Sequence, residues 1–410
     1  MRYAKRFRLF VAIILALSFI ASGCVLPATA IPPFSTLSLP NSTISASLPT
    51  ATQHEQSLPM VILSNTEDAT ELGPVSTASL TPTATVMPTA TATVPPAPEI
   101  TLLFTGVIVP ARCVQSAIDR HADANYIYDE VREVISSADL AVGTLNTSLS
   151  DLSTHTGCIE TYVLVSDSRS AVAAAKAGFD VMSVATNHIK NCAGASCTDN
   201  YNRAFFDTLD NLRANNILPV GAGNNMAEAL QPVVVEVKGV RFGFVSLGMV
   251  EPNAFAGENS PGIAELTDEN LQSVIAAAKQ VSDVVIAMPH WGPEDTSQPN
   301  SYQLHFAQIA VEAGADVVVG NHTHVVQAIQ QINGIDVFYG LGNFVFDQTW
   351  DPTMAHQQGV ILLLHFKGTE YTGYELIPTH VDGDGTVHIA DDSEAANILQ
   401  RIRQASDELR

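Results

Sequence analysis

The chain has 410 residues, of which 46% are hydrophobic and only 15% are charged, so a wholly disordered protein is excluded. Its 19 lysines and arginines face 42 aspartates and glutamates, which gives a net charge of −23. Such an acidic chain lacks the basic face that binding to nucleic acid requires, and we expect no nucleic-acid partner.

The first 23 residues are predicted to be a lipoprotein signal peptide. A basic stretch, residues 1–8, precedes an apolar run, residues 9–20, which is shorter than the roughly 20 residues that a transmembrane helix needs. Small residues then lead to Cys24 in a pattern that resembles a bacterial lipobox, which predicts a lipid anchor at Cys24. A plain signal peptide or an uncleaved anchor is the alternative. Each interpretation places the rest of the chain outside the cytoplasm.

Residues 24–98 are predicted to be a disordered tether. The segment is built from Thr, Ser, Pro and Ala, and it contains no Lys or Arg and a single aromatic residue, Phe34. With so few large apolar side chains, it cannot offset the entropy that is lost on ordering. The globular part is therefore expected over residues 99–390, followed by a polar C-terminal helix over residues 391–410.

Four cysteines lie in the globular part, and an even number in an exported protein favours two disulfides. Three pairings are open. We favour the pairing that joins Cys192 to Cys197, which closes a short loop, and Cys113 to Cys158. A zinc site with cysteine ligands is the competing interpretation, although the spacings match no common zinc pattern.

Apolar stretches of strand length alternate with helix-like segments along the globular part. In chain order, strands are predicted over residues 99–109, 139–145, 179–185, 283–288 and 316–319, and helices over residues 124–137, 167–177, 200–215, 267–281 and 301–313. Two hairpins are also predicted, one over residues 233–247 and one that turns at Asn333-Gly334. Continuous β-branched runs between helices indicate strands covered on both faces. The predicted fold class is therefore α/β, with mixed sheets in a four-layer α/β/β/α sandwich.

Three of the predicted strands end in polar residues that can bind a metal ion. These residues, in chain order, are Asn187, His188, His290, His322 and His324. Because strand ends that meet at one edge of an α/β sheet are where such folds place their sites, we expect these side chains to lie together. Imidazole nitrogens and an amide oxygen suit a divalent ion.

The chain resembles a known family in four stretches that carry these residues, FDVMSVATNH, AMPHWGPE, AVEAGADVVVGNHTHVVQAIQ and GIDVFYGLGNFVFDQ. This is the bacterial capsule-synthesis, poly-γ-glutamate (CapA) family, which is similar to calcineurin-like metallophosphoesterases. The resemblance covers residues 100–380. It implies a metal-bearing four-layer sandwich and a role in making or attaching an anionic surface polymer.

The resemblance also implies a role for each strand-end residue. Asn187, His290 and His322 match ligands of one metal ion, and His324 matches a ligand of a second. His188 matches the position that often serves as general acid. Three more residues of the matching stretches could contact substrate, namely Glu294, Asn343 and Asp347.

The chain departs from the family pattern at three acidic positions. Val107 stands where the family has aspartate, Asn146 where it has glutamate, and Asn191 where aspartate is frequent. Two neighbouring cations need anionic ligands to offset their repulsion, and these three residues supply none. We therefore expect at most one divalent ion (Mn, Zn or Mg), with water molecules completing its ligands.

The favoured hypothesis is a membrane-anchored lipoprotein of the cell surface that acts in the synthesis or attachment of an anionic envelope polymer such as poly-γ-glutamate. Its expected partners are the polymer itself or capsule-assembly proteins. One alternative is an active metal-dependent hydrolase or phosphoesterase of an envelope polymer, in which His188 would protonate the leaving group. Another is a solute-binding lipoprotein, which would not explain the histidines at the strand ends.

Overall fold

The computed structural model describes residues 96–195, 197, 202–350, 353 and 355–409. The predicted signal peptide, Cys24 and nearly all of the predicted tether lie outside these residues. Within the described part, no helix is both long enough and apolar enough to cross a membrane.

The first of two large sheets has eight strands and is mixed. In spatial order the strands are β18 (Val387–Ile389), β17 (Glu370–Val381), β16 (Gln358–Lys367), β1 (Glu99–Ile108), β2 (Leu140–Leu145), β5 (Val181–Ser183) and β6 (Leu218–Val220), with β15 (Asn343–Val345) also paired to β1. Strand β1 pairs in parallel with β2 on one side and antiparallel with β16 on the other.

The second large sheet has six strands and is also mixed. In spatial order they are β13 (Ile329–Ile332), β14 (Ile335–Phe338), β12 (Val317–Val319), β11 (Val284–His290), β9 (Val240–Gly248) and β8 (Val233–Val237). Strands β9, β11, β12 and β14 run parallel, and hairpins add β8 and β13 as antiparallel edges. Two short pairs complete the strands, β3 (Ser148–Leu149) with β4 (Val165–Ser166) and β7 (Ala222–Gly223) with β10 (Gly262–Ile263).

The two large sheets pack face to face, and apolar side chains from both fill the space between them. The rings of Phe104 on β1 and Phe244 on β9 lie 6.5 Å apart, and those of Phe242 and Phe366 lie 5.1 Å apart. Each inner strand is therefore buried on both faces, which explains why strands such as β11 read as continuous apolar runs.

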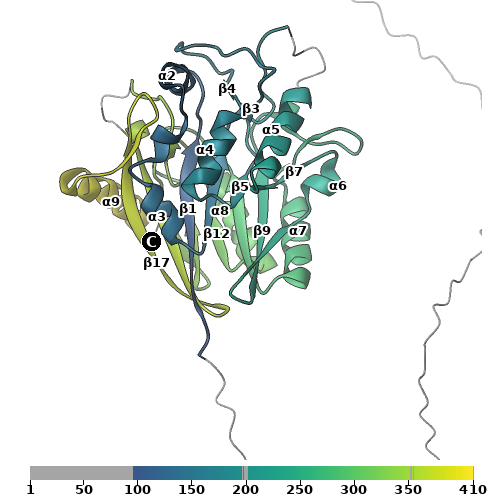
Figure 1. The fold of residues 1–410 in the computed structure, drawn as a ribbon. Coiled ribbons are helices and arrows are strands. Elements are labelled where there is room, and N and C mark those ends of the chain that lie inside the picture. Colours follow the sequence, from purple (N-terminus) through teal and green to yellow (C-terminus); the bar gives the residue numbers. More distant parts are fainter. Residues whose placement is uncertain (1–95, 196, 198–201, 351–352, 354, 410) are drawn as a thin grey trace, which may run out of the picture. The chain divides into compact units, whose positions relative to one another are not determined.

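Helices cover the outer faces of both sheets (Figure 1). The first sheet is covered by α2 (Cys113–His121), the 3₁₀ turn η1 (Asn125–Tyr128), α3 (Arg132–Ser137), α4 (Arg169–Ala177) and α5 (Asn202–Ala214). The second is covered by α6 (Met226–Ala229), α7 (Asp268–Val281) and α8 (Ser301–Ala313). The 3₁₀ turns η2 (Pro252–Ala254) and η3 (Ala355–Gln357) lie in loops. This arrangement confirms the predicted four-layer α/β/β/α sandwich.

Local signals set the helix boundaries where the sequence predicts them. Helix α7 begins after Thr267, whose side chain accepts the Asn270 N–H, and α8 begins after Asn300, which forms a reciprocal capping box with Gln303. Helix α8 ends at Gly314, whose left-handed backbone (φ 99°) suits a residue without Cβ.

The structure corrects several of the predicted elements. The helix predicted over residues 124–137 is divided into η1 and α3, and α2 and the long β16–β17 hairpin were not predicted. The polar C-terminal helix exists as α9 (Asp392–Asp407), and it is part of the folded body. Its buried Ile398 and Ile402 join the core between the sheets, because the helix packs against β13 and β17.

Both favoured disulfides are present, Cys113–Cys158 and Cys192–Cys197. The zinc site with cysteine ligands is therefore wrong for these four residues. The two disulfides indicate an oxidising compartment outside the cytoplasm. Cys113 begins α2, so the first of them ties this helix to the loop between β3 and β4.

Candidate metal centre and its cavity

Strand ends from both sheets bring three potential metal ligands together. Asn187 follows β5 of the first sheet, whereas His290 ends β11 and His322 follows β12 of the second. The Nε2 atom of His290 lies 3.0 Å from Asn187 Oδ1 and 3.2 Å from His322 Nδ1. Ligands about 2.1 Å from a common ion, at angles of 90–110°, are roughly 3.0–3.4 Å apart. His290 Nε2 is thus spaced from each of its two neighbours as ligands of one ion would be. We call this group the histidine–amide cluster.

The other two predicted residues lie next to this cluster. His324 Nδ1 is 2.9 Å from Asn343 Oδ1, and its Nε2 is 3.9 Å from Glu294 Oε1. His188 Nδ1 is 2.9 Å from Asn191 Oδ1. An amide oxygen can only accept, so in each histidine Nδ1 carries the proton and Nε2 has a free lone pair.

The backbone of the GNHTH motif adopts uncommon conformations at both of its histidines. His322 (φ 106°) and His324 (φ 59°) both adopt positive φ, which is uncommon for residues with a Cβ and clusters at functional sites. Gly320 lies against Trp291, where an added Cβ would come within 2.3 Å of the indole Nε1. That indole is buried and donates to the Tyr339 carbonyl at 2.9 Å. The motifs HWG and GNHTH therefore pack on each other.

Burial keeps these histidines neutral. It lowers the pKa of His290 well below its ordinary value, lowers that of His322 to about 3 and that of His324 to about 4, with the neighbouring histidines adding to the effect. Burial also lowers the pKa of His188. Neutral imidazoles have the lone pair that a metal ion needs, so the donor set fits one divalent ion.

The three residues that stand where carboxylates were expected pack against or hydrogen-bond to their neighbours. Val107 is fully buried in an apolar cluster with Val109, Ala111, Leu164 and Phe346. Asn146 Oδ1 accepts the His188 N–H at 3.0 Å, while its Nδ2 is buried without a hydrogen-bond partner in the described part of the chain. Asn191 Oδ1 also accepts the Leu164 N–H. The structure thus places no carboxylate at any of the three positions.

A cavity of about 540 Å³ opens beside His188 and His324. His188, His324 and Glu294 line it, so two of the predicted site histidines face the same space. The other lining residues are Arg112, Glu160, Thr161, Tyr162, Leu164, Asp295, Phe346, Gln348, Trp350 and His356.

Two residues that could contact substrate are engaged within the protein. Asp347 forms a buried ion pair with Arg112 and accepts the Cys113 N–H at 2.9 Å. Asn343 holds His324 through its Oδ1 and donates through its Nδ2 to the carbonyl of His356 at 2.8 Å. These contacts hold both side chains within the protein, whereas Glu294 lines the open cavity.

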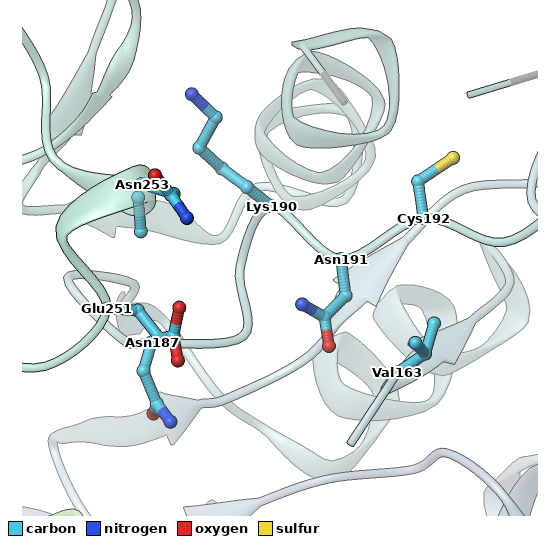
Figure 2. Close-up of a pocket in the computed structure, with 8 residues that line it drawn as sticks. Val163, Asn187, Lys190, Asn191, Cys192, Glu251 and Asn253 are labelled. Carbon is cyan, nitrogen blue, oxygen red and sulfur yellow. The ribbon is translucent and has the colours of Figure 1, made fainter. Parts of the chain in front are cut away.

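A smaller pocket of about 220 Å³ lies beside Asn187 (Figure 2). Lys190, Asn191, Glu251 and Asn253 line it with polar groups. The Lys190 ammonium donates to the Pro261 carbonyl at 2.9 Å, and burial lowers its pKa. Asn187 and His188, adjacent in the chain, thus face two different pockets.

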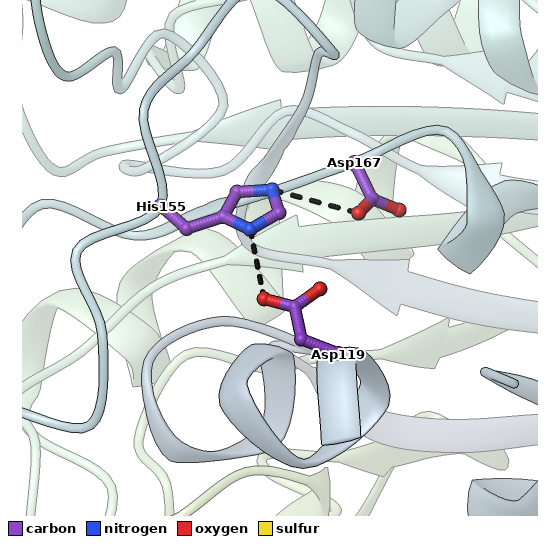
Figure 3. Close-up of side chains that lie close together, drawn as sticks. All are labelled: Asp119, His155 and Asp167. Carbon is purple, nitrogen blue, oxygen red and sulfur yellow. Dashed lines mark hydrogen bonds and ion pairs between the residues drawn. The ribbon is translucent and has the colours of Figure 1, made fainter. Parts of the chain in front are cut away.

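A second polar group, which sequence reasoning missed, lies on the helical side of the first sheet (Figure 3). His155 Nδ1 is 3.1 Å from Asp119 Oδ2, and its Nε2 is 3.5 Å from Asp167 Oδ2. Ligand atoms of the three residues lie within 4.8 Å of one another and could hold a metal ion. We call this group the carboxylate cluster. The Arg169 guanidinium already contacts both carboxylates.

The disulfide pairing was the signal that could have revealed the carboxylate cluster. Cys113 lies six residues before Asp119, and Cys158 lies three residues after His155. Joining the two cysteines therefore brings His155 next to helix α2. The family resemblance offered no such signal, because none of its four stretches contains these residues.

Comparison with known proteins supports the family resemblance. Residues 101–348 match the family model described as "Bacterial capsule synthesis protein PGA_cap". The "PGA biosynthesis protein CapA" of Bacillus subtilis is 28% identical over 280 residues, which are 68% of this chain and 70% of that protein. The "Capsule biosynthesis protein CapA" of Bacillus anthracis is 27% identical over 292 residues, 69% and 68% of the two chains. Among solved structures, a phosphatase from Mycoplasma pneumoniae matches with TM-score 0.43 and 12% identity, over 74% of this chain and 97% of its own.

Proposed function

Because the chain belongs to the family of bacterial capsule synthesis proteins, we propose that it acts in the synthesis or attachment of an anionic envelope polymer such as poly-γ-glutamate. The observation that carries this proposal is the family match over residues 101–348, which includes every residue of the histidine–amide cluster. Two curated relatives have names that refer to the biosynthesis of PGA or of the capsule. The polymer or other capsule-assembly proteins are the expected partners.

We also propose that the protein is held at the cell surface by a lipid on Cys24. The lipobox-like pattern supports this, and the two disulfides agree with an exported protein. Replacing Cys24 with alanine should move the protein from the membrane fraction to the soluble extracytoplasmic fraction. Retention of the variant in the membrane would contradict a lipid at this residue.

We propose that Asn187, His290 and His322 hold a single divalent ion (Mn, Zn or Mg). When bound, such an ion would act as a Lewis acid that polarises a substrate oxygen. The cluster would hold the ion through neutral ligand atoms only, because Val107 and Asn146 stand where the family pattern has carboxylates. His324, proposed from the family pattern as a ligand of a second ion, lines the cavity, and its Nε2 lies 3.9 Å from the Glu294 carboxylate.

His188 would move a proton at the floor of the cavity. Its Nδ1 proton is committed to Asn191, so its Nε2 is poised to accept a proton rather than to donate one. We therefore propose His188 as a proton acceptor, which departs from the general-acid role that the family pattern implied. An active metal-dependent hydrolase remains the second candidate function, and the placement of His188 on the cavity wall favours it.

Two measurements test these proposals. Deleting the gene in its own bacterium should reduce the glutamate polymer bound to the envelope, as measured by amino-acid analysis of washed envelopes, and an unchanged content would contradict the proposed role. Elemental analysis of the purified protein should find one divalent ion per chain. Two ions, or none after incubation with Mn, Zn or Mg, would contradict the proposed site. Release of phosphate or polymer fragments that disappears in His188→Ala would establish the hydrolase.

A further inference from the structure

The large cavity has a rim and a floor of different chemistry. Tyr162 is 86% exposed and Trp350 is 53% exposed, and Glu160 beside Tyr162 is also exposed, so these three residues form the rim. His324 is only 3% exposed and lines the same cavity, so it belongs to the floor together with His188. Its Nε2 faces the cavity, with the Glu294 carboxylate 3.9 Å away. The cavity therefore joins an open aromatic rim to buried polar groups.

The charges around this cavity leave an excess of carboxylate. The Arg112 guanidinium is matched by Asp347, and Asp295 is 2.6 Å from His356 Nε2. Glu160 has no ion pair within the described part of the chain, and the Glu294 side chain is 44% exposed, with the histidine nitrogens beside it about 4 Å away. A ligand that presents carboxylates to the rim would be repelled, whereas a cationic group would be attracted.

The aromatic side chains of the cavity already accept a cation. The Arg112 guanidinium carbon lies 4.7 Å from the centre of the Phe346 ring and 5.5 Å from that of Trp350. This geometry shows that the ring faces on this wall are presented to positive charge. Trp350 and Tyr162 extend the same chemistry to the rim, where solvent and ligand can reach it.

We propose that the cavity binds a ligand with a primary ammonium group, which sits at the rim between the Tyr162 and Trp350 rings and the Glu160 carboxylate. This inference rests on the proposed function and names the ligand class of that site. A poly-γ-glutamate chain carries a carboxylate on every residue but a free amine only at one end. The rim would therefore select the amine end of such a chain and reject its polyanionic body.

Tryptophan fluorescence can test the proposal directly. The chain has two tryptophans, of which Trp291 is buried and Trp350 is exposed at the rim. The probes are the dipeptide γ-glutamyl-glutamate with a free amino group and the same dipeptide with that group acetylated. We expect the free amine to change the Trp350 emission and to bind roughly tenfold more tightly than the acetylated form, since the lost cation–π and charge contacts are together worth about that factor. The change should vanish in Trp350→Phe.

Two charge variants separate a local contact from the general field of an acidic protein. Glu160→Gln should weaken binding of the free amine roughly fivefold to tenfold. Glu375→Gln removes the same charge from an exposed position on β17 and should leave the affinity unchanged. Equal affinity for both dipeptides, no binding of either, or an equal loss in the two charge variants would overturn the proposal. A reduced envelope polymer after gene deletion would still support the proposed function in that case, so the two failures are distinguishable.

Discussion

The histidine–amide cluster and the carboxylate cluster each group three side chains that can bind a metal ion, but they differ in whether the protein itself supplies their partners. In the carboxylate cluster, Arg169 supplies the positive charge, and both nitrogens of His155 face carboxylates. In the histidine–amide cluster the ligand atoms face one another, and no charged group lies among them. Two neighbouring atoms there, His290 Nδ1 and Asn146 Nδ2, are buried without a hydrogen-bond partner in the described part of the chain.

This difference shows how a binding site can be told from a structural network. A cluster that has satisfied its charges with the protein's own side chains has little to gain from a ligand, because the ligand must first displace them. Buried ligand atoms that face each other with no nearby charged group gain the most favourable interaction energy when a metal ion binds. Negative charge alone would favour the carboxylate cluster as a cation site, whereas the lack of internal partners among the described residues favours the histidine–amide cluster.

The largest expected effect would break the carboxylate cluster while leaving the histidines in place. Cys113→Ser with Cys158→Ser opens a loop of 45 residues, which should lower the free energy of unfolding by about 4 kcal/mol. Because that disulfide brings His155 to α2, the carboxylate cluster should loosen. Urea unfolding measures the loss. Cys192→Ser with Cys197→Ser, whose loop spans five residues, is the control and should lose about 2 kcal/mol.

Placing an anion at Val107, which pairs with the His324 partner Asn343, tests whether packing excludes a carboxylate there. Val107→Asp puts a carboxylate into a site that is fully buried among apolar side chains, so it should cost about 3 kcal/mol of stability. The melting temperature of the variant, measured by circular dichroism, should fall accordingly. A stable variant that binds a second ion would mean that this position still accepts a metal-binding carboxylate.

Removing one ligand from each cluster compares them as metal sites. His290→Ala should weaken the binding of a divalent ion roughly a hundredfold or more, because one of three proposed ligands is lost. His155→Ala should leave the ion affinity unchanged. Isothermal titration with Mn or Zn measures both. Loss of the ion in His155→Ala and its retention in His290→Ala would reverse the assignment.

A milder change tests whether the neutral ligand set limits the affinity. Asn146→Asp keeps the oxygen that accepts the His188 N–H and replaces the unpartnered Nδ2 with an anionic oxygen. We expect ion binding to tighten roughly tenfold, since an anion beside the cluster offsets the charge of the ion. The variant should be less stable than the parent when chelator is present and more stable when the ion is added. Equal melting temperatures under the two conditions would contradict this.

The smallest expected effect concerns pH and the carboxylate cluster. Burial raises the pKa of Asp119, but hydrogen bonds from Arg169, His155 and Gln115 outweigh it, and the pKa ends below its ordinary value of 3.8. A carboxyl group whose pKa is lower in the folded than in the unfolded protein stabilises the fold at pH values above its unfolded pKa. This stabilisation is lost as the pH falls through its folded pKa. Asp119→Asn should therefore be slightly destabilised at pH 7, and this deficit should shrink as the pH is lowered below 3.8, as judged by urea unfolding. A deficit that stays the same over this pH range would contradict the ionic origin.

The strand ends of the site could be predicted because they depend on local patterns. Apolar runs that stop at Asn187, His290 and His322 place these residues at the carboxyl ends of parallel strands, and such ends meet at one edge. The favoured disulfides followed from the even number of cysteines and the short gap between two of them. These inferences needed no knowledge of which distant side chains meet.

The remaining parts depended on long-range contacts that have no local signature. Asp347 pairs with Arg112 across 235 positions, so sequence alone suggested a role at the substrate. The sequence also could not predict whether the space around Val107 would accept a carboxylate, because two of the apolar side chains around it, Leu164 and Phe346, come from distant segments. The polar C-terminal helix appeared detached, since its three buried residues are too few to indicate a core face.

The direction of strand β1 separates the start of the folded body from the candidate site. The folded body begins just before Glu99, at the amino end of β1, and the other end of this strand, near Ile108, lies beside the histidines, as the pairing of Val107 with Asn343 shows. Ten residues of strand separate these ends by roughly 33 Å. The histidines and the start of the strand therefore lie at opposite ends of β1. Changes near Glu99 are thus separated from the site by the full length of this strand.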